Sequence, residues 1–149
     1  GYGNGRFEFN AMIWADKKAF LLDPFCMVSS DGADGALSTG RKDPMIWACF
    51  PIFFDRMVRQ WKWLGMETAV YKCTGLPAEM LGFSDRGVLK AGMAADIVVF
   101  DPQTISGEEH WDKWNTIPTG IDCTIVNGEI VWRDGKHTGA RPGRFLTKR

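Results

Sequence analysis

The alternation of apolar and polar positions predicts helices in the middle of the chain. Between residues 51 and 64, apolar side chains recur at three- and four-residue spacing, which is typical of an amphipathic helix. Pro51 suits the first turn of that helix, and Gly65 suits the position just after its end. Two shorter helices are predicted at 67–73 and 77–82, with a Thr-Gly-Leu-Pro break between them.

The first third of the chain holds a mixed pattern, then an apolar run, then a long loop. Residues 7–20 mix apolar and polar positions in a way that favours a helix over a strand. Over 25–30, the run Phe-Cys-Met-Val ends in Ser-Ser without polar alternation, which predicts a strand buried on both faces, as in parallel sheets. The glycine-rich segment 32–44 is predicted to be a loop, and long ordered loops are often functional.

The C-terminal part reads as short strands. A strand is predicted at 97–100, and two more at 123–126 and 129–132 flank the dipeptide Asn127-Gly128. Asn-Gly between two β-rich runs is a strong hairpin signal, because both central residues of the tight turn take positive φ. The tail over 137–144 is predicted to be irregular. The order of elements therefore predicts an α/β fold, with a small β-layer after the helices.

The predicted strands lack neighbours within this sequence. A parallel strand at 25–30 needs partners on both edges, and no comparable run with a crossover helix follows it. The C-terminal strands would likewise leave open edges that invite pairing. The chain also begins at Gly1 and not at Met. We therefore expect it to be part of something larger, with homo-oligomerisation through open β edges as another outcome.

Composition narrows the classes of partner. The 149 residues fit one ordinary domain, and 45% hydrophobic residues suffice for a sizeable core. Lys+Arg and Asp+Glu both number 18, so no basic excess points to nucleic acid. No apolar run approaches the roughly 18 residues of a membrane span, and the start does not resemble a signal peptide. We expect a cytoplasmic protein without a nucleic-acid or membrane partner.

Cysteine, histidine and tryptophan positions offer little chemistry. The four cysteines contain no C-x-x-C pair, which predicts free, mostly buried thiols and neither a zinc site nor a disulfide framework. His110 and His137 are far apart and are expected to be surface or loop residues. Tryptophans are expected to pack in the core and its rim, with a partner surface as the alternative for Trp111 and Trp114.

Asp31 is the candidate catalytic residue. It ends the apolar run in the sequence VSSDG, and Asp-Gly is common in turns that close a strand. A carboxylate at the carboxyl end of a strand also occupies the place where barrel enzymes keep their chemistry. The residues alone leave both interpretations open.

Several motifs together narrow the choice. The sequence GVLKAGMAADIVVFD at 87–101 resembles the C-terminal signature of the amidohydrolase superfamily. VNGEIV at 126–131, GKHTGARPGR at 135–144, TGLPAE at 74–79 and SDG at 30–32 resemble its N-acyl-D-amino-acid deacylase (D-aminoacylase) branch, in the same order. The resemblance covers nearly all of the chain beyond residue 24.

The resemblance implies a specific architecture. The family fold is a metal-dependent (β/α)₈ barrel with a small β-sandwich made from both chain ends. Residues 1–82 would then supply the C-terminal part of the barrel, with its last strand at 25–30, and 83–149 would supply the C-terminal part of the sandwich and a tail. The zinc ligands of the family come from earlier strands, so this chain alone is expected to bind no zinc.

The resemblance also implies a reaction, the hydrolysis of a C–N amide bond in N-acyl-D-amino acids. Asp31 matches the aspartate that acts as general acid/base, taking a proton from a metal-bound water and passing it to the leaving amine. A zinc-bound water with a pKa near ~7 needs a nearby carboxylate to move its proton. The isolated chain is expected to be inactive, because the metal ligands lie outside it.

The chain departs from the family pattern after the long loop. The family usually carries His-Pro-Arg there, whereas this chain reads Asp43-Pro44-Met45. In the family that arginine helps to hold the substrate carboxylate, and Met45 carries no charge for this task. Arg41 or Lys42 could take its place. Asp43 is expected to start a turn, with a metal ligand as the alternative.

Two other functions stay open beside the deacylase. One is a non-catalytic module that associates through its open β edges. The other is a hydantoinase-like hydrolase of cyclic amides, against which the Gly-Ala-Arg-Pro-Gly tail argues. Asp96 is expected to be a turn residue that positions the strand after it.

Overall fold

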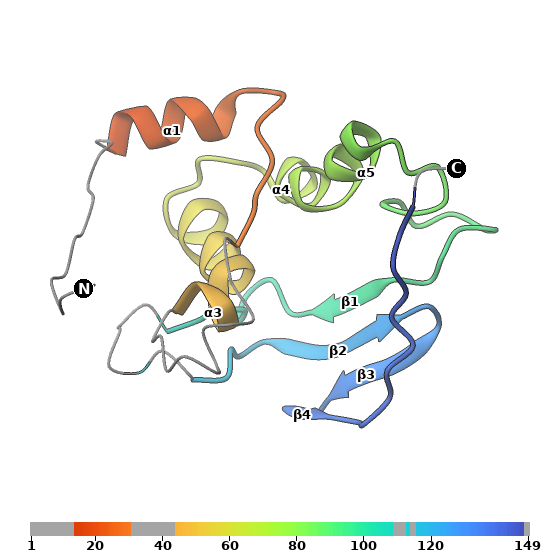
Figure 1. Cartoon of the computed structure of the whole chain (residues 1–149). Coiled ribbons are helices and arrows are strands. Elements are labelled where there is room, and N and C mark those ends of the chain that lie inside the picture. The colour runs from red at the N-terminus through yellow and green to blue at the C-terminus, as the bar shows by residue number, and fades with distance from the viewer. Residues whose placement is uncertain (1–13, 31–43, 109–112, 114–115, 148–149) are drawn as a thin grey trace, which may run out of the picture.

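The fold was analysed in a computed structural model, which describes residues 14–30, 44–108, 113 and 116–147. The helices lie on the β1 side of the sheet, and β2, β3 and β4 follow β1 in order, away from the helices (Figure 1). The mixture of helices and strands agrees with the predicted α/β class. In chain order the elements are α1 (Trp14–Leu22), α3 (Pro44–Phe53), the π-helix η1 (Phe54–Gln60), α4 (Met66–Cys73), α5 (Gly75–Leu81), β1 (Ile97–Phe100), β2 (Ile121–Val126), β3 (Glu129–Arg133) and β4 (Lys136–His137).

The long helix differs from the prediction of 51–64 at both ends. It begins at Pro44, so Pro51 lies inside α3 and not in its first turn. Because proline has no N–H, the carbonyl of Trp47 cannot receive the usual α-helical hydrogen bond from position 51. The helix then continues with a wider turn as η1 and ends at Gln60, so Leu64 lies outside it. The predicted C-terminal end was wrong because the spacing of apolar residues cannot distinguish the wider turn of a π-helix from that of an α-helix.

No strand forms over 25–30 in this chain, contrary to the prediction. Residues 26–30 carry no regular structure, and every strand pair of the described sheet is antiparallel. A run of apolar residues becomes a strand only where neighbouring strands satisfy its backbone. Here the N–H of Val28 instead donates to the carbonyl of Lys72 at 3.4 Å.

The two shorter helices lie close to the predicted bounds. α4 begins one residue before the expected 67–73, and α5 begins two residues before the expected 77–82, so Pro77 is its third residue. Gly82 follows α5 with φ 75°, a left-handed conformation that suits glycine at a helix end. The N–H of Phe83 donates to the carbonyl of Ala78 at 2.8 Å and closes this end.

The predicted hairpin is present. Asn127 and Gly128 have φ of 47° and 85°, as the tight turn between β2 and β3 requires. The sheet has the order β1-β2-β3-β4, and the short β4 pairs His137 with Trp132. The tail predicted to be irregular from residue 137 therefore begins with this pairing.

One core joins the helices to the strand region. Phe54 of η1 lies 5.2 Å from Phe100 of β1 between ring centroids. Gly120, just before β2, allows the chain to approach the loop after β1 closely, because a Cβ at position 120 would lie 2.4 Å from the Ile105 nitrogen. The division predicted between 1–82 and 83–149 stays a prediction. The buried cluster consists of Phe53, Phe54, Val58, Leu64, Ala69 and Ile105.

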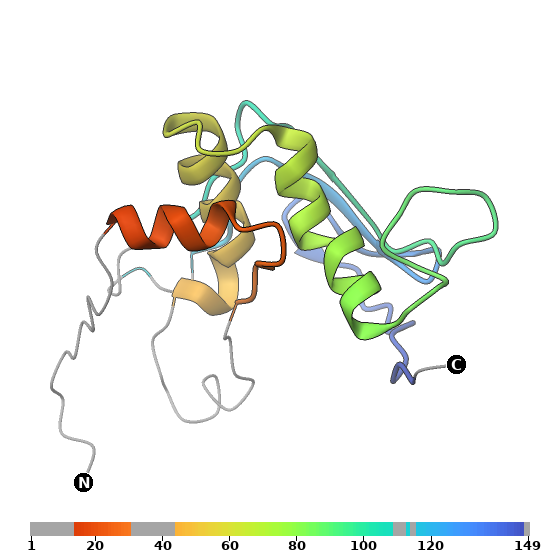
Figure 2. The same cartoon turned by 90° about the horizontal axis from the view of Figure 1, so that it is seen from above.

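Helix α1 packs on the rest of the molecule partly through aromatic rings. The Trp14 ring lies 4.9 Å from Trp61, and Trp61 lies 4.8 Å from Trp63, between centroids. This is the rim packing predicted for Trp61 and Trp63. Seen from above, α1 lies across the helical side of the molecule, with α4 and α5 beside the sheet (Figure 2). Within the described residues, no helix is long and apolar enough to cross a membrane.

Candidate functional site

Asp31, the predicted acid/base, lies outside the described residues, so its role stays a prediction. The same holds for Arg41, Lys42, Asp43 and His110. Trp111 and Trp114 also lie outside them. The structure does describe the segment that leads to Asp31, residues 23–30, and the helices that hold this segment.

Helix α4 holds the segment through Lys72. The Lys72 side chain is 2% exposed, and its Nζ donates to the carbonyl oxygens of Asp23 and, at 2.9 Å, of Cys26. The segment also closes on itself, since the Phe25 N–H donates to Asp23 Oδ1 at 2.9 Å. The carbonyl groups after α1 are thus gathered around one buried ammonium group.

Helix α3 contacts the same segment closer to Asp31. The Cys49 thiol donates to the Ser29 carbonyl, with a sulfur–oxygen distance of 3.5 Å. Burial, with a smaller effect of Cys49, raises the pKa of the Cys73 thiol to about 12. Because the thiolate is the reactive form of cysteine, Cys73 is unsuited to act as a nucleophile. All four cysteines are free, as predicted, but only Cys123 is buried, so the expectation of mostly buried thiols was wrong.

A second polar cluster surrounds Asp55 in η1, and it was not predicted from the sequence. Arg59 Nη2 and Gln60 Nε2 donate to Asp55 Oδ1 at 2.6 and 2.7 Å. Ser106 Oγ donates to Oδ2 at 2.7 Å, and Arg59 Nη1 reaches the Ile105 carbonyl at 2.8 Å. We call Asp55, Arg59, Gln60 and Ser106 the Asp55 cluster. Through Ser106, the Asp55 cluster joins η1 to the loop that follows β1.

The electrostatics of the Asp55 cluster favour the ionised form of the Asp55 side chain. Burial opposes the ionisation of Asp55, but hydrogen bonds from Ser106 and Gln60 and the charge of Arg59 outweigh it. The pKa of Asp55 is therefore lowered from its ordinary value. With its oxygens occupied by donors from the chain itself, this carboxylate has a structural role and is not poised as an acid/base.

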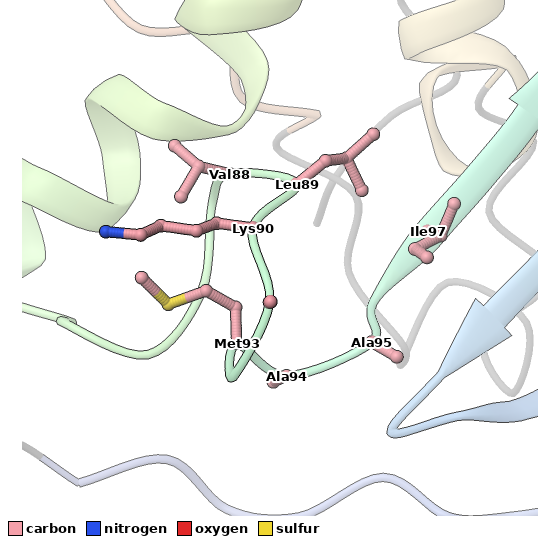
Figure 3. Close-up of a pocket in the computed structure, with 8 residues that line it drawn as sticks. Val88, Leu89, Lys90, Met93, Ala94, Ala95 and Ile97 are labelled. Carbon is pink, nitrogen blue, oxygen red and sulfur yellow. The ribbon is translucent and has the colours of Figure 1, made fainter.

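A hollow of about 280 Å³ lies in the loop before β1. Its walls are mostly aliphatic, and Lys90 extends away from Ile97 (Figure 3). Among the residues that the structure describes, no carboxylate, histidine or thiol lines it, so acid/base chemistry has no support there. Nearby, Asp96 pairs with Arg86 and accepts the Asn127 N–H at 2.8 Å. This agrees with the predicted role of Asp96 in positioning β1.

The described residues do not fit a metal centre. Across 14–30, 44–108, 113 and 116–147, no three His, Cys, Asp or Glu side chains are grouped so that they could hold a metal ion. His137 is exposed, and its Nδ1 accepts the Gly139 N–H at 2.9 Å. The surface position agrees with the prediction, although His137 lies in β4 and not in a loop. Whether the chain binds zinc stays a prediction.

Comparison with known proteins decides the family. The model of the amidohydrolase family matches residues 43–132. The chain belongs to the amidohydrolase family. The motifs therefore indicated the right superfamily, and the relatives below confirm the likeness to its deacylase branch.

An N-acyl-D-aspartate deacylase from Alcaligenes xylosoxydans xylosoxydans is 39% identical over 136 residues, which are 91% of this amidohydrolase chain and 26% of the relative. A dihydroorotase from Lactobacillus acidophilus is 32% identical over 96 residues, 58% of this chain and 23% of that protein. The chain spans about a quarter of the length of the curated deacylases it matches.

Solved structures of deacylases have a similar fold. The N-acyl-D-glutamate deacylase of Bordetella bronchiseptica, in complex with zinc and a phosphonate inhibitor, matches with a TM-score of 0.75 at 38% identity. The match covers 83% of this chain and 25% of that one. A D-aminoacylase variant in complex with copper chloride matches with a TM-score of 0.81 at 35% identity, over 91% of this chain and 28% of that one.

Proposed function

We propose that this chain is the C-terminal portion of a hydrolase that cleaves the amide bond of N-acyl-D-amino acids, with Asp31 as general acid/base. The observation that carries the proposal is the match to the N-acyl-D-aspartate deacylase, which extends over 136 of the 149 residues. Because the match covers 91% of the chain, it begins before Asp31 and extends beyond it. Residues 1–82 would belong to a (β/α)₈ barrel, and 83–149 to a β-sandwich.

Unpartnered apolar side chains support a larger protein. Phe20 and Phe25, at and after α1, are 60% and 72% exposed. On the edge strand β1, Val98 and Val99 are 51% and 44% exposed. Exposed large apolar groups on more than one element support surfaces that a further part of the protein covers. The missing part of the same enzyme would cover them.

The proposed reaction requires one proton relay. The Asp31 carboxylate accepts a proton as water attacks the amide carbon, and a C–O bond forms. The protonated Asp31 then donates this proton to the nitrogen as the C–N bond breaks, which yields a carboxylic acid and a free amine and restores the Asp31 carboxylate. Zinc would polarise the carbonyl group and the water in the intact enzyme. Because the described residues do not fit a metal site, its ligands would come from elsewhere in the protein.

Substrate recognition is proposed to differ from the family pattern. Met45 at the start of α3 carries no charge, so it cannot pair with a substrate carboxylate. Arg41 or Lys42 would have to supply that charge. Replacement of each by Met in the intact enzyme should raise KM for acidic substrates if it does so.

A cyclic amide hydrolase is the second candidate, and the match to a dihydroorotase favours it. That match covers 58% of this chain, against 91% for the N-acyl-D-aspartate deacylase, so the deacylase is preferred. Both hydrolyses can be assayed on one preparation. Ring opening of a dihydropyrimidine without deacylation would reverse the preference.

The test compares this chain with a longer protein translated from the same gene with its upstream coding sequence. We expect the 149-residue chain to hold no stoichiometric zinc and to leave N-acetyl-D-glutamate and N-acetyl-D-leucine intact. The longer protein should bind zinc and hydrolyse at least one of them. Asp31→Asn should lower its kcat by about 10²- to 10⁴-fold. Zinc-dependent turnover by the short chain, or full activity of Asp31→Asn, would contradict the proposal.

A further inference from the structure

A second hollow, of about 400 Å³, lies beyond the C-terminal end of α5, and we call it the tail hollow. Its walls come from the loop at 82–86, the turn before β1 at 92–94, Asn127 of the hairpin turn, and the C-terminal tail at 144–147. All of these residues belong to the C-terminal half of the chain, and none lies in the segment around Asp31. A volume of this size suits a small organic molecule.

Hydrogen bonds and an ion pair join the inner walls of the tail hollow to one another. The Ala94 N–H donates to the Asp85 carbonyl at 2.7 Å. Arg86 pairs with Asp96, and Asp96 accepts the Asn127 N–H at 2.8 Å. The loop after α5, the turn before β1 and the hairpin turn are therefore held together by contacts within the C-terminal half of the chain.

The tail motif GKHTGARPGR leads to the outer wall, and the proposed hydrolysis gives this motif no task. The Thr138 hydroxyl group donates to a carbonyl group of β3 at 2.7 Å. Asn127 Nδ2 donates to the Pro142 carbonyl at 2.8 Å. Beyond this contact the tail runs towards the end of α5 (Figure 1), and residues 144–147 line the tail hollow. The motif thus places Arg144 in the wall of the tail hollow.

The charged groups in this wall are unequally satisfied. The Arg86 side chain is 16% exposed, and it pairs with Asp96 and, through Nε at 3.2 Å, with Asp85 Oδ1. The Asp85 side chain is 41% exposed. Within the residues that the structure describes, neither Asp85 Oδ2 nor the guanidinium group of Arg144 has a partner. The tail hollow thus offers one unpaired cation and one carboxylate oxygen that can accept further hydrogen bonds.

We propose that the tail hollow binds a free α-amino acid with an apolar side chain. Arg144 pairs with the carboxylate of the ligand, since a guanidinium group can hold a carboxylate through two hydrogen bonds. Asp85 Oδ2 accepts the ammonium group. The apolar side chain of the ligand lies against the apolar residues of the lining, which are Phe83, Met93 and Leu146.

The balance of charge favours a zwitterion over a simple ion. Arg86 and Arg144 contribute two positive charges, and Asp85 and Asp96 contribute two negative charges, so the site as a whole is neutral. A carboxylate without an ammonium group leaves Asp85 without its ligand partner, and an amine without a carboxylate leaves Arg144 without one. The inference is independent of the proposed hydrolysis, although that reaction would release a molecule of this class.

The first measurement titrates the isotope-labelled 149-residue chain with D-leucine and with L-leucine by NMR. We expect saturable shifts of the Ser84, Arg86 and Asn127 amide signals with at least one enantiomer. The Kd should be on the order of 1 mM, because leucine has few atoms with which to bind. Isocaproate lacks the ammonium group and isopentylamine lacks the carboxylate, so each should bind about tenfold more weakly. N-acetyl-D-leucine should bind as weakly as isocaproate.

The second measurement removes each charged group of the protein in turn. Arg144→Gln and Asp85→Asn should each weaken the binding of leucine about tenfold. The controls are Arg141→Gln, at an exposed arginine of the same tail, and Asp122→Asn, at an exposed position of β2, and both should leave the Kd unchanged. Asp85 also pairs with Arg86, so thermal unfolding is measured for each variant. If Asp85→Asn does not fold, the Kd of Arg144→Gln decides.

Three results would each overturn the inference. They are the absence of saturable shifts at the tail hollow up to about 20 mM leucine, well above the expected Kd, an unchanged Kd in Arg144→Gln, and equal affinities for leucine and isocaproate. A tenfold loss in Arg144→Gln, with an unchanged Kd in Arg141→Gln, would support it. Because none of these measurements uses turnover, full activity of Asp31→Asn in the longer protein would overturn the proposed function and leave this inference standing.

Discussion

Two buried charged residues, Asp55 and Lys72, are stabilised in opposite ways. Asp55 is 6% exposed and is met by a guanidinium, an amide and a hydroxyl group from side chains. Lys72 is 2% exposed, and in the part of the chain that the structure describes its Nζ is met by main-chain carbonyl groups. One charge is compensated by an opposite charge, and the other by backbone dipoles.

The difference indicates different roles. The partners of Asp55 lie on η1 and, through Ser106, after β1, so the Asp55 cluster joins two parts of the core. The partners of Lys72 lie on a segment without regular structure that leads to Asp31. Breaking a buried ion pair by removing one partner is strongly destabilising. We therefore expect Asp55 to govern stability and Lys72 to govern the placement of the segment.

Removal of Asp55 should give the largest loss of stability. Asp55→Ala removes the acceptor of Arg59 Nη2, Gln60 Nε2 and Ser106 Oγ, and we expect the free energy of unfolding to fall by about 3 kcal/mol. Urea unfolding monitored by circular dichroism measures this loss. Asp122→Ala, at an exposed position of β2, is the matched control and should change stability by less than about 0.5 kcal/mol. Equal losses of stability in Asp55→Ala and Asp122→Ala would contradict the expectation that Asp55 governs stability.

A substitution at Gly120 tests whether the Asp55 cluster depends on the close approach of Gly120 to the loop after β1. Its φ is 75°, and a Cβ would meet the Ile105 nitrogen at 2.4 Å, one residue before Ser106. Gly120→Ala should therefore cost about 2 kcal/mol or more by urea unfolding, because the backbone must shift. Gly92 has φ of 88° with open space around it, so Gly92→Ala carries only the conformational cost of about 1 kcal/mol. Equal losses would show that the close contact is unimportant.

Sequence reasoning succeeded where the signal was local. Asn127-Gly128 encodes the turn by its own backbone preferences, and the hairpin forms as predicted. The strand expected at 25–30 does not form, because a strand depends on neighbours that a local pattern cannot supply. The start of α3 was misplaced because Pro44 and Pro51 both suit a first turn, and tertiary packing decides between them.

The sites were predictable to different degrees. Asp31 was singled out by its resemblance to a family motif, since its spacing alone also fits a turn. Asp55 and Arg59 could be seen as an i, i+4 ion pair. Gln60 joins them only because of the wider η1 turn, and Ser106 lies 51 residues away from Asp55. Lys72 has the sequence context of an ordinary helical lysine, and nothing there indicates its burial.

Ser106→Ala should give the smallest effect and should reveal the charge of Asp55 through pH. The variant loses a hydrogen bond to a carboxylate, which costs about 1.5 kcal/mol at pH 7. The folded pKa of Asp55 is lowered below its ordinary 3.8, so its contribution is fully present above that value and is lost as pH falls through the folded pKa. The difference between wild type and Ser106→Ala should stay constant from pH 7 to about 5 and shrink below about 4. Urea unfolding across this range measures it. Thr104→Val, which removes the hydrogen bond from the hydroxyl group of the exposed Thr104 to Asp101, is the control and should cost less. A pH-independent difference would mean that the Asp55 carboxylate is not what Ser106 stabilises.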